Sequence, residues 1–361
     1  MTGPRYRAGL VVGKFAPLHT GHELLIRRAL SECERLVILS YARPEFEGCG
    51  PVARERWLRQ SFPEAQICVL SDEVLAGGSL RAHGFASLPD HSAPESVHRR
   101  FVGAVCVHRL GVAIDVVWTS EAYGDGLARE LTEYYRLANS DYPTVAHVCV
   151  DPERSKVPIS ATRVRADVHA ARRYLPDHVY ASFVERVVLL GGESSGKSTL
   201  SRALARHFDT AWVAEYGREL WEQQDGRLDY ADFEKIAVAQ VAREEAALAC
   251  CRRYLFCDTS PLTTRMYSQF LFGKVAPKVE ALAARSYHHT VLCAPDFPFV
   301  QDGTRQESGF RDEQHRRYRR ELAARGIAHI TVGGSLVQRV KRVAGVLREA
   351  SIQQGQAARP T

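Results

Sequence analysis

The segment 187–200, VVLLGGESSGKSTL, constrains the fold of this chain more than any other stretch of its 361 residues. A run of apolar, β-branched residues ends at a glycine, and a sequence of helical character follows the pattern Gly-x-x-x-x-Gly-Lys-Ser. In such a phosphate-binding loop, or P-loop, backbone N–H groups surround phosphate oxygens at the start of a helix. The order strand, loop, helix therefore predicts a parallel α/β domain that holds a nucleotide.

The side chains of this loop complete a set for binding a triphosphate. The Lys197 ammonium would reach the β and γ oxygens, and the Ser198 hydroxyl would bind Mg²⁺. The predicted ATP-binding residues of this half of the chain are Gly191, Gly192, Glu193, Ser194, Ser195, Gly196, Lys197, Ser198 and Thr199. The loop alone leaves open whether the terminal phosphate goes to water or to an acceptor.

Two acidic residues follow apolar runs further along the chain. Asp258 comes directly after residues 254–257, where a carboxylate can hold Mg²⁺ together with Ser198. Glu215 follows another short apolar run and would accept a proton from a substrate hydroxyl, although Asp258 or water are alternatives for that role. We expect Lys197, Glu215 and Asp258 to be the catalytic residues of phosphoryl transfer.

A later loop and helix are predicted to contact the acceptor and to close this site. Asp296, Asp302 and Arg305 lie in the segment 295–306, PDFPFVQDGTRQ, which follows an apolar strand candidate. Arg311 belongs to the basic helical segment that comes next and is the first choice for a lid contact with phosphate. The alternative is an ordinary solvated helix arginine.

Short apolar segments alternate with helical patterns along the whole chain. This alternation predicts βαβ units, and hence parallel sheets with helices on both faces. A new strand begins near residue 186 after a segment interrupted by Pro176, so we predict two α/β domains in series, 1–184 and 185–361. The segment 76–95 is rich in Gly, Pro and Ser and is predicted to be a long surface loop.

The decapeptide GKFAPLHTGH, residues 13–22, marks a second strand-to-helix junction. Imidazole N–H groups can bind phosphate oxygens without a permanent charge, so His19 and His22 on the first helical turn predict an anion site. The alternative is a surface histidine followed by a cap histidine. In the segment 159–165, ISATRVR, Ser160 or Thr162 can donate to phosphate and Arg165 can clamp it.

Composition bounds the class of protein without identifying a ligand. The chain is 45% hydrophobic and 25% charged with a formal charge of +6, which suits phosphorylated substrates but is too weak to indicate nucleic acid. No apolar stretch is long enough to span a bilayer, and no signal peptide is recognisable. The nine cysteines are scattered, so we expect reduced thiols and a cytoplasmic location.

The two motifs of the first half resemble the nucleotidyltransferase superfamily that shares an H-x-G-H motif, which includes nicotinamide mononucleotide (NMN) adenylyltransferases. The resemblance implies His19 and His22 as catalytic residues. It implies an ATP site made of Gly13, Lys14, Phe15, His19, His22, Ser160, Thr162 and Arg165. The segment 117–125, VWTSEAYGD, resembles the nicotinamide-binding segment of these enzymes, and the implied substrate-binding residues in it are Trp118, Glu121 and Tyr123. Arg56, in the segment 53–62, could reach a substrate phosphate, and the alternative is a solvated helix arginine.

The motifs of the second half, GGESSGKSTL, EYGREL, CDTSPLTT and DGTR, resemble a ribosylnicotinamide kinase domain. In NadR-type bifunctional proteins this domain follows an NMN adenylyltransferase. The resemblance implies phosphorylation of nicotinamide riboside with ATP in the second domain and adenylylation of NMN to NAD and pyrophosphate in the first, with Mg²⁺ at each site. Some members carry an N-terminal helix-turn-helix domain. Only a few residues precede the first strand here, so no role in binding nucleic acid is expected.

Two alternatives to this interpretation remain at this point. The same fold could act on another phosphorylated acceptor, or the protein could sense ATP or NAD with little turnover. The sequence is compatible with a homo-oligomer and predicts no membrane insertion.

Overall fold

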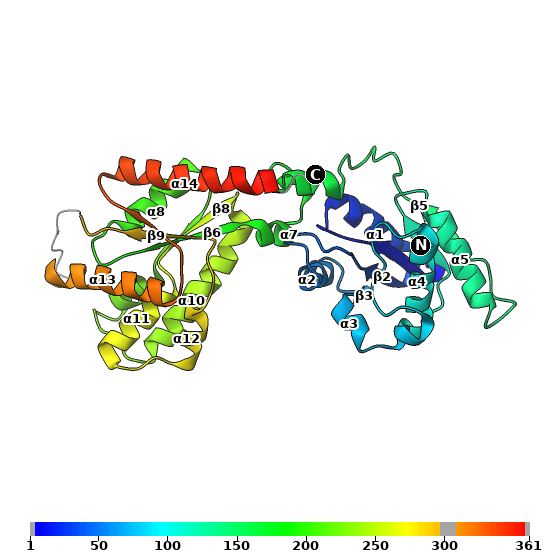
Figure 1. The fold of residues 1–361 in the computed structure, drawn as a ribbon, viewed down its shortest axis with the longest axis horizontal. Coiled ribbons are helices and arrows are strands. Elements are labelled where there is room, and N and C mark those ends of the chain that lie inside the picture. The colour runs from blue at the N-terminus through cyan, green and yellow to red at the C-terminus, as the bar shows by residue number, and fades with distance from the viewer. Residues whose placement is uncertain (1–3, 297–307, 358–361) are drawn as a thin grey trace. The chain divides into compact units, whose positions relative to one another are not determined.

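The computed structural model describes residues 4–296 and 308–357, and the chain forms two compact units, Met1–Ser182 and Phe183–Thr361 (Figure 1). Each unit contains one parallel five-stranded sheet, so the predicted α/β class is confirmed. The predicted contact residues Asp302 and Arg305 lie outside the described residues.

The first sheet has the strand order β3-β2-β1-β4-β5. Its strands are β1 (Tyr6–Gly13), β2 (Cys33–Ser40), β3 (Gln66–Val69), β4 (Val116–Thr119) and β5 (Ala146–Cys149). The chain leaves β1 toward β2 on one side and reaches β4 on the other, and β1 pairs in parallel with both. In such sheets ligands bind in the crevice outside the carboxyl ends of the strands, at the point where the strand order reverses. That point is the end of β1, where the decapeptide begins.

In the described part of the first unit, α-helices follow the strands, with several short elements between them, the last of which ends at the first residue of the second unit. The main helices are α1 (Thr20–Glu32), α2 (Pro51–Ser61), α3 (Asp72–Ala76), α4 (Glu95–Ala104), α5 (Gly124–Arg136) and α6 (Ala161–Ala166). The others are η1 (Ser79–His83), the π-helical η2 (Val105–Leu110), η3 (Arg172–Tyr174), α7 (Asp177–Tyr180) and η4 (Ala181–Phe183). The segment 76–95 was predicted to be a surface loop, but it packs partly into the unit, because Leu80 and Leu88 are buried in the core.

The second sheet has the order β10-β9-β6-β8-β7. Its strands are β6 (Glu185–Leu190), β7 (Trp212–Val213), β8 (Tyr254–Asp258), β9 (His289–Cys293) and β10 (Ile330–Val332). The central strand β6 pairs with both β8 and β9, so the P-loop that follows it also lies where the strand order reverses.

Helices cover both faces of the second sheet. Helices α8 and α14 lie on one face, and α10, α11, α12 and α13 lie on the other (Figure 1). The helices are α8 (Lys197–His207), α9 (Tyr216–Gln223), α10 (Asp232–Ala247), α11 (Pro261–Phe272), α12 (Pro277–Ala283), α13 (Ser308–Ala324) and α14 (Leu336–Ala357), with the short η5 (Leu248–Cys250) after α10. None of the helices within the described ranges combines the length and apolar character needed to cross a bilayer.

Candidate active sites

The two histidines of the decapeptide form one cap at the start of α1. His19 is the N-cap residue and its ring accepts a hydrogen bond from the His22 N–H, while the His22 ring accepts one from the His19 N–H, both at 3.4 Å. The rings stack with centroids 3.7 Å apart. Because Nδ1 of each ring accepts, the proton of each neutral imidazole is on Nε2, which leaves two N–H donors for a ligand.

Electrostatics favour the neutral form of both rings. Burial, followed by the nearby positive charge of Arg154, lowers the pKa of His19 to about 4. Burial and then the neighbouring His19 lower the pKa of His22 well below its usual value. At neutral pH both rings are therefore neutral, so this pair would bind an anion by hydrogen bonding rather than by charge.

Two residues at the end of β1, Gly13 and Phe15, support these rings. Phe15 is buried, has a φ of 48° and lies edge-on to the His22 ring at 5.0 Å. A Cβ on Gly13 would lie 2.9 Å from the Phe15 ring, so the glycine is needed for this packing. The Phe15 ring thus packs against His22 and is not exposed to a ligand.

Positive charge gathers beside this cap from two distant segments. Arg165 donates to the Ala16 carbonyl at 2.5 Å and to Thr162 Oγ1 at 3.2 Å, and its guanidinium lies 4.0 Å from the centre of the Phe46 ring. The Lys14 ammonium lies 5.7 Å from the same ring. Burial and then the Arg165 charge lower the pKa of Lys14. Ser160, in turn, caps α6 by accepting from the Arg163 N–H at 3.3 Å.

Arg154 belongs to this group and was not singled out in the sequence. It lies on the loop before α6, influences both histidines, and donates to Glu121 at 3.1 Å. The predicted residue Glu121 is thus connected to the site by its ion pair with Arg154. An arginine in a loop belongs to no periodic pattern, so the sequence gives no signal for it.

The structure corrects the role predicted for Trp118. Its indole is completely buried in β4, packs edge-on against Tyr6 at 6.3 Å, and leaves no face for a nicotinamide ring. A Cβ on Gly9 would lie 3.2 Å from its Nε1, so the indole occupies the face of the sheet above β1. Trp118 is a core residue.

Two other predicted substrate contacts have structural partners. The Tyr123 hydroxyl donates to the Val12 carbonyl at 3.0 Å and so holds the end of β1. The Arg56 guanidinium donates to Ser182 Oγ at 2.9 Å, beside the Trp57 indole that donates to the same oxygen. For Tyr123 and Arg56, contact with the substrate stays a prediction.

In the second unit, the Lys197 side chain folds back over the P-loop. Its Nζ donates to the carbonyl oxygens of Gly191 and Gly192 at 2.9 and 3.0 Å. Gly191 has a φ of 147°, and a Cβ there would lie 2.9 Å from the Cys293 carbonyl, so only glycine fits. Ser195 Oγ donates to the Gly192 carbonyl at 2.7 Å and stabilises the turn.

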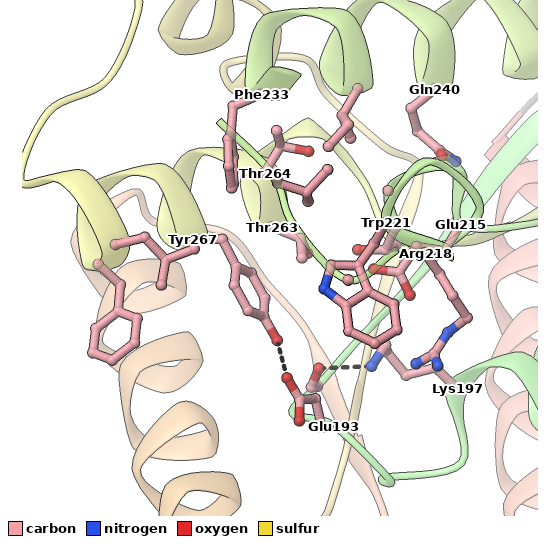
Figure 2. Close-up of a pocket in the computed structure, with 18 of the residues that line it drawn as sticks. Glu193, Lys197, Glu215, Arg218, Trp221, Phe233, Gln240, Thr263, Thr264 and Tyr267 are labelled. Atoms are coloured by element: carbon pink, nitrogen blue, oxygen red, sulfur yellow. Dashed lines mark hydrogen bonds between the residues drawn. The ribbon is translucent and has the colours of Figure 1, made fainter. Parts of the chain in front are cut away.

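A cavity of about 670 Å³ opens in front of this loop (Figure 2). Its floor includes the predicted residues Gly191, Glu193, Lys197 and Glu215. The remaining wall is partly aromatic and was not identified from the sequence, because it comes from four separate helices and loops. Those lining residues include Arg218, Trp221, Phe233, Gln240, Thr263, Thr264, Tyr267 and Tyr318.

The two predicted acids lie at this cavity or directly beneath it. Burial raises the pKa of Glu215; Lys197 opposes the shift and Asp258 adds to it. Asp258 is 2% exposed, and its Oδ1 has no hydrogen-bond donor among the described residues. A buried carboxylate oxygen without a donor is a chemically suitable ligand for Mg²⁺, a hard cation that prefers oxygen. The described residues contain no group of three or more His, Cys, Asp or Glu suited to hold a metal by themselves.

A further network ties the P-loop to α11 and α13. The Gln314 side chain accepts from the Glu193 N–H at 2.8 Å and donates to the Tyr267 hydroxyl at 2.6 Å. That hydroxyl donates to Glu193 Oε1 at 3.2 Å (Figure 2). A Cβ on Gly192 would lie 3.1 Å from the Arg311 carbonyl. Helix α13 therefore lies against the loop, and a lid contact by the Arg311 side chain stays a prediction.

Asp296, a predicted acceptor contact, is bound by other residues of the protein. Its carboxylate accepts from the buried Arg339 and from the Gly334 N–H, so it joins the ends of β9 and β10. The same Arg339 donates to the Ser195 carbonyl at 2.7 Å. Asp296 thus supports the back of the P-loop. It is not among the described residues that line the cavity, and a contact between it and the acceptor stays a prediction.

Known proteins resemble this chain in sequence. Residues 186–339 match the model of a family described as AAA domain. The chain is 31% identical over 315 residues to the trifunctional NAD biosynthesis/regulator protein NadR of Salmonella typhimurium and to that of Escherichia coli, which covers 82% of this chain and 71% of each relative.

Solved structures share the whole fold. A NadR protein in complex with NR superimposes with a TM-score of 0.67 at 20% identity, over 97% of this chain and 96% of that one. A NadR protein in complex with NAD and AMP-PNP gives 0.66 at 21% identity, over 92% and 93%. With both phosphate-binding motifs placed at the points where the strand order of each sheet reverses, and with this identity over most of its length, the chain belongs to the NadR family.

Proposed function

We propose that the protein is a bifunctional enzyme of NAD biosynthesis. Domain 1–184 would adenylylate NMN with ATP, and domain 185–361 would phosphorylate nicotinamide riboside with ATP. The observation that carries the proposal is that this member of the NadR family has two separate sites with the groups that each reaction needs: the His19–His22 cap and the P-loop with Glu215 and Asp258.

In the first reaction, an oxygen of the NMN phosphate attacks the α-phosphorus of ATP, and the bond to the β-phosphate breaks to release pyrophosphate. Both reactants already carry the reacting oxygens, so the protein need supply no nucleophile. Positioning and stabilisation of negative charge suffice. The Nε2–H groups of His19 and His22, with Lys14, Arg154 and Arg165, would supply them.

In the second reaction, the riboside hydroxyl attacks the γ-phosphorus of ATP and ADP leaves. Glu215 lines the cavity and would take the hydroxyl proton, while Lys197 would leave the loop carbonyls to meet the phosphates. The rings of Trp221 and Tyr267 both point into the cavity, as Figure 2 shows, and offer flat surfaces for a nicotinamide ring.

Mg²⁺ would be held in this second site by Ser198 and Asp258. When bound, it would neutralise charge on the β and γ phosphates. The unpartnered Oδ1 of Asp258 supports this assignment.

The test is to incubate the pure full-length protein with ATP, Mg²⁺ and either nicotinamide riboside or NMN, and to separate the products by chromatography. NMN and then NAD should form from the riboside, and NAD and pyrophosphate should form from NMN. Turnover of other acceptors only would favour a different substrate. Binding of ATP without any product would favour a sensor and contradict the proposal.

A further inference from the structure

A histidine far from both motifs contacts the lysine of the first site. His91 Nδ1 lies 2.7 Å from Lys14 Nζ, although 77 positions separate the two residues in the chain. An ammonium group only donates, so Nδ1 of His91 is the acceptor and its ring proton is on Nε2. His91 lies in the segment 76–95, which has no recognisable motif.

The position of His91 is determined by ties to other loops at the carboxyl edge of the sheet. Its backbone N–H donates to the Arg43 carbonyl at 2.9 Å, and Arg43 Nη1 donates to the Leu88 carbonyl at 3.2 Å. The Leu88 N–H donates to Asp72 Oδ1 at 2.7 Å. The two neighbours of His91 are bound to each other, because Asp90 Oδ1 accepts from the Ser92 N–H at 3.0 Å. The segment is thus a strap that brings one imidazole to Lys14.

His91 holds the Lys14 ammonium through a hydrogen bond, whereas the charges of Arg165 and Glu121 act on it in opposite directions. The Phe46 ring is 5.7 Å away and is shared with Arg165, whose like charge opposes that of Lys14. A long lysine side chain has several rotamers, and a hydrogen bond to a fixed acceptor removes most of them. Pre-orientation of a cation lowers the cost of stabilising charge in a transition state.

We propose that His91 is a positioning residue of the first site, which holds the Lys14 ammonium toward the phosphates during adenylyl transfer. The inference rests on the proposed NMN adenylyltransferase function. It adds a residue outside the motifs and explains why the segment between β3 and α4 is tied back to the sheet edge. His91 itself need not touch the substrate.

The first test compares three replacements of His91 in the full-length protein. His91→Ala should lower kcat/KM for NMN adenylylation about tenfold, the expected size for one hydrogen bond to a charged group. His91→Asn places an acceptor near the position of Nδ1 and should restore most of the rate, whereas His91→Gln places it near Nε2 and should not. Native activity of His91→Ala, or equal loss in all three variants, would overturn the inference.

The second test asks whether His91 acts through Lys14. In a double-mutant cycle, Lys14→Ala with His91→Ala should be no slower than Lys14→Ala alone. Full additivity of the two losses would overturn the inference.

Riboside phosphorylation by the same samples reports that the chain is folded, and it should stay at the native rate. His83→Ala is the matched control: His83 lies in the same segment but stacks on His108 at 3.4 Å, so adenylylation should be unchanged. If the native protein itself makes no NAD from NMN, it is the proposed function that fails, and this outcome is distinct from a native-like His91→Ala.

Discussion

The imidazoles of His19 and His22 each accept a hydrogen bond from the other residue's backbone N–H, and their rings stack 3.7 Å apart. This reciprocal cap has two consequences. It satisfies backbone donors at the start of α1 that would otherwise lack a partner. It also fixes both ring protons on Nε2, so a single arrangement begins the helix and prepares two donors for phosphate.

The two roles of this cap can be separated by substitution. His22→Ala should abolish NMN adenylylation and leave riboside phosphorylation unchanged. His19→Asn should keep the cap, since asparagine is a good N-cap residue, yet lose the Nε2 donor. We therefore expect His19→Asn to keep its native unfolding temperature, measured by calorimetry, while adenylylation falls about 100-fold, the size found for loss of one oxyanion donor. A native rate in His19→Asn would remove His19 from the catalytic residues.

The P-loop lysine should affect only the other reaction. Lys197→Ala should abolish riboside phosphorylation, because the variant lacks the P-loop ammonium that would bind the β and γ phosphates of ATP. NMN adenylylation should continue at the native rate in a direct assay of both products. Loss of both activities in a variant that remains folded would contradict two independent sites.

Glu215 should set the acid limb of the kinase pH profile. A general base must be ionised, so the rate should rise with pH as the Glu215 carboxyl loses its proton. Burial raises the pKa of this carboxyl, and the limb should therefore lie at higher pH than an ordinary glutamate would give.

Glu215→Gln should lower kcat roughly 100-fold and abolish this limb. The matched variant Asp258→Asn should instead raise the Mg²⁺ concentration needed for half-maximal rate. A native kcat in Glu215→Gln would transfer the role of base to Asp258 or to water.

A buried carboxyl on α10 should make the second unit less stable at higher pH. Burial raises the pKa of Glu244 to about 7, and the nearby charge of Glu245 adds to the shift. The hydrogen bond from Tyr287 and the charges of Arg285 and Arg186 act in the opposite direction. The folded protein thus keeps a proton there that an unfolded glutamate has already lost. Between about pH 4.5 and pH 7 the free energy of unfolding should fall as pH rises, by at most about 1.4 kcal/mol per pH unit for one proton.

Glu244→Gln should remove that slope, because the amide does not titrate and can still accept from the Tyr287 hydroxyl. Calorimetry of the full-length protein at several pH values in this range would measure it. The control is Glu245→Gln: the pKa of Glu245 is lowered, so its titration lies below this window and the slope should persist. An unchanged slope in Glu244→Gln would mean that another group titrates.

Much of the architecture could be predicted from local sequence. Parallel strands buried on both faces require continuous apolar runs, and a loop that surrounds phosphate requires glycines at set positions, so both features appear within short windows. The two α/β sheets and the position of His19, His22 and the P-loop at strand ends followed from such windows. The NadR-type resemblance likewise rested on short motifs, and comparison confirmed it.

Other features depend on which face of an element a side chain occupies or on contacts between distant segments. Trp118 in β4 lies among core residues, and a four-residue strand buried throughout has no alternation that predicts which face its indole takes. Asp296 follows a strand as predicted, but it is bound by Arg339, which comes from α14.

The sequence by itself determined the two sheets, their order in the chain and the two strand-to-helix junctions that carry the motifs, because glycine spacing and apolar runs act over a few residues. Only the tertiary structure decided the surroundings of those junctions: Arg154 beside the histidines, His91 on Lys14, and the aromatic wall opposite the P-loop. These contacts join residues that are far apart in the chain. Their geometry follows from the packing of whole elements, which no local pattern encodes.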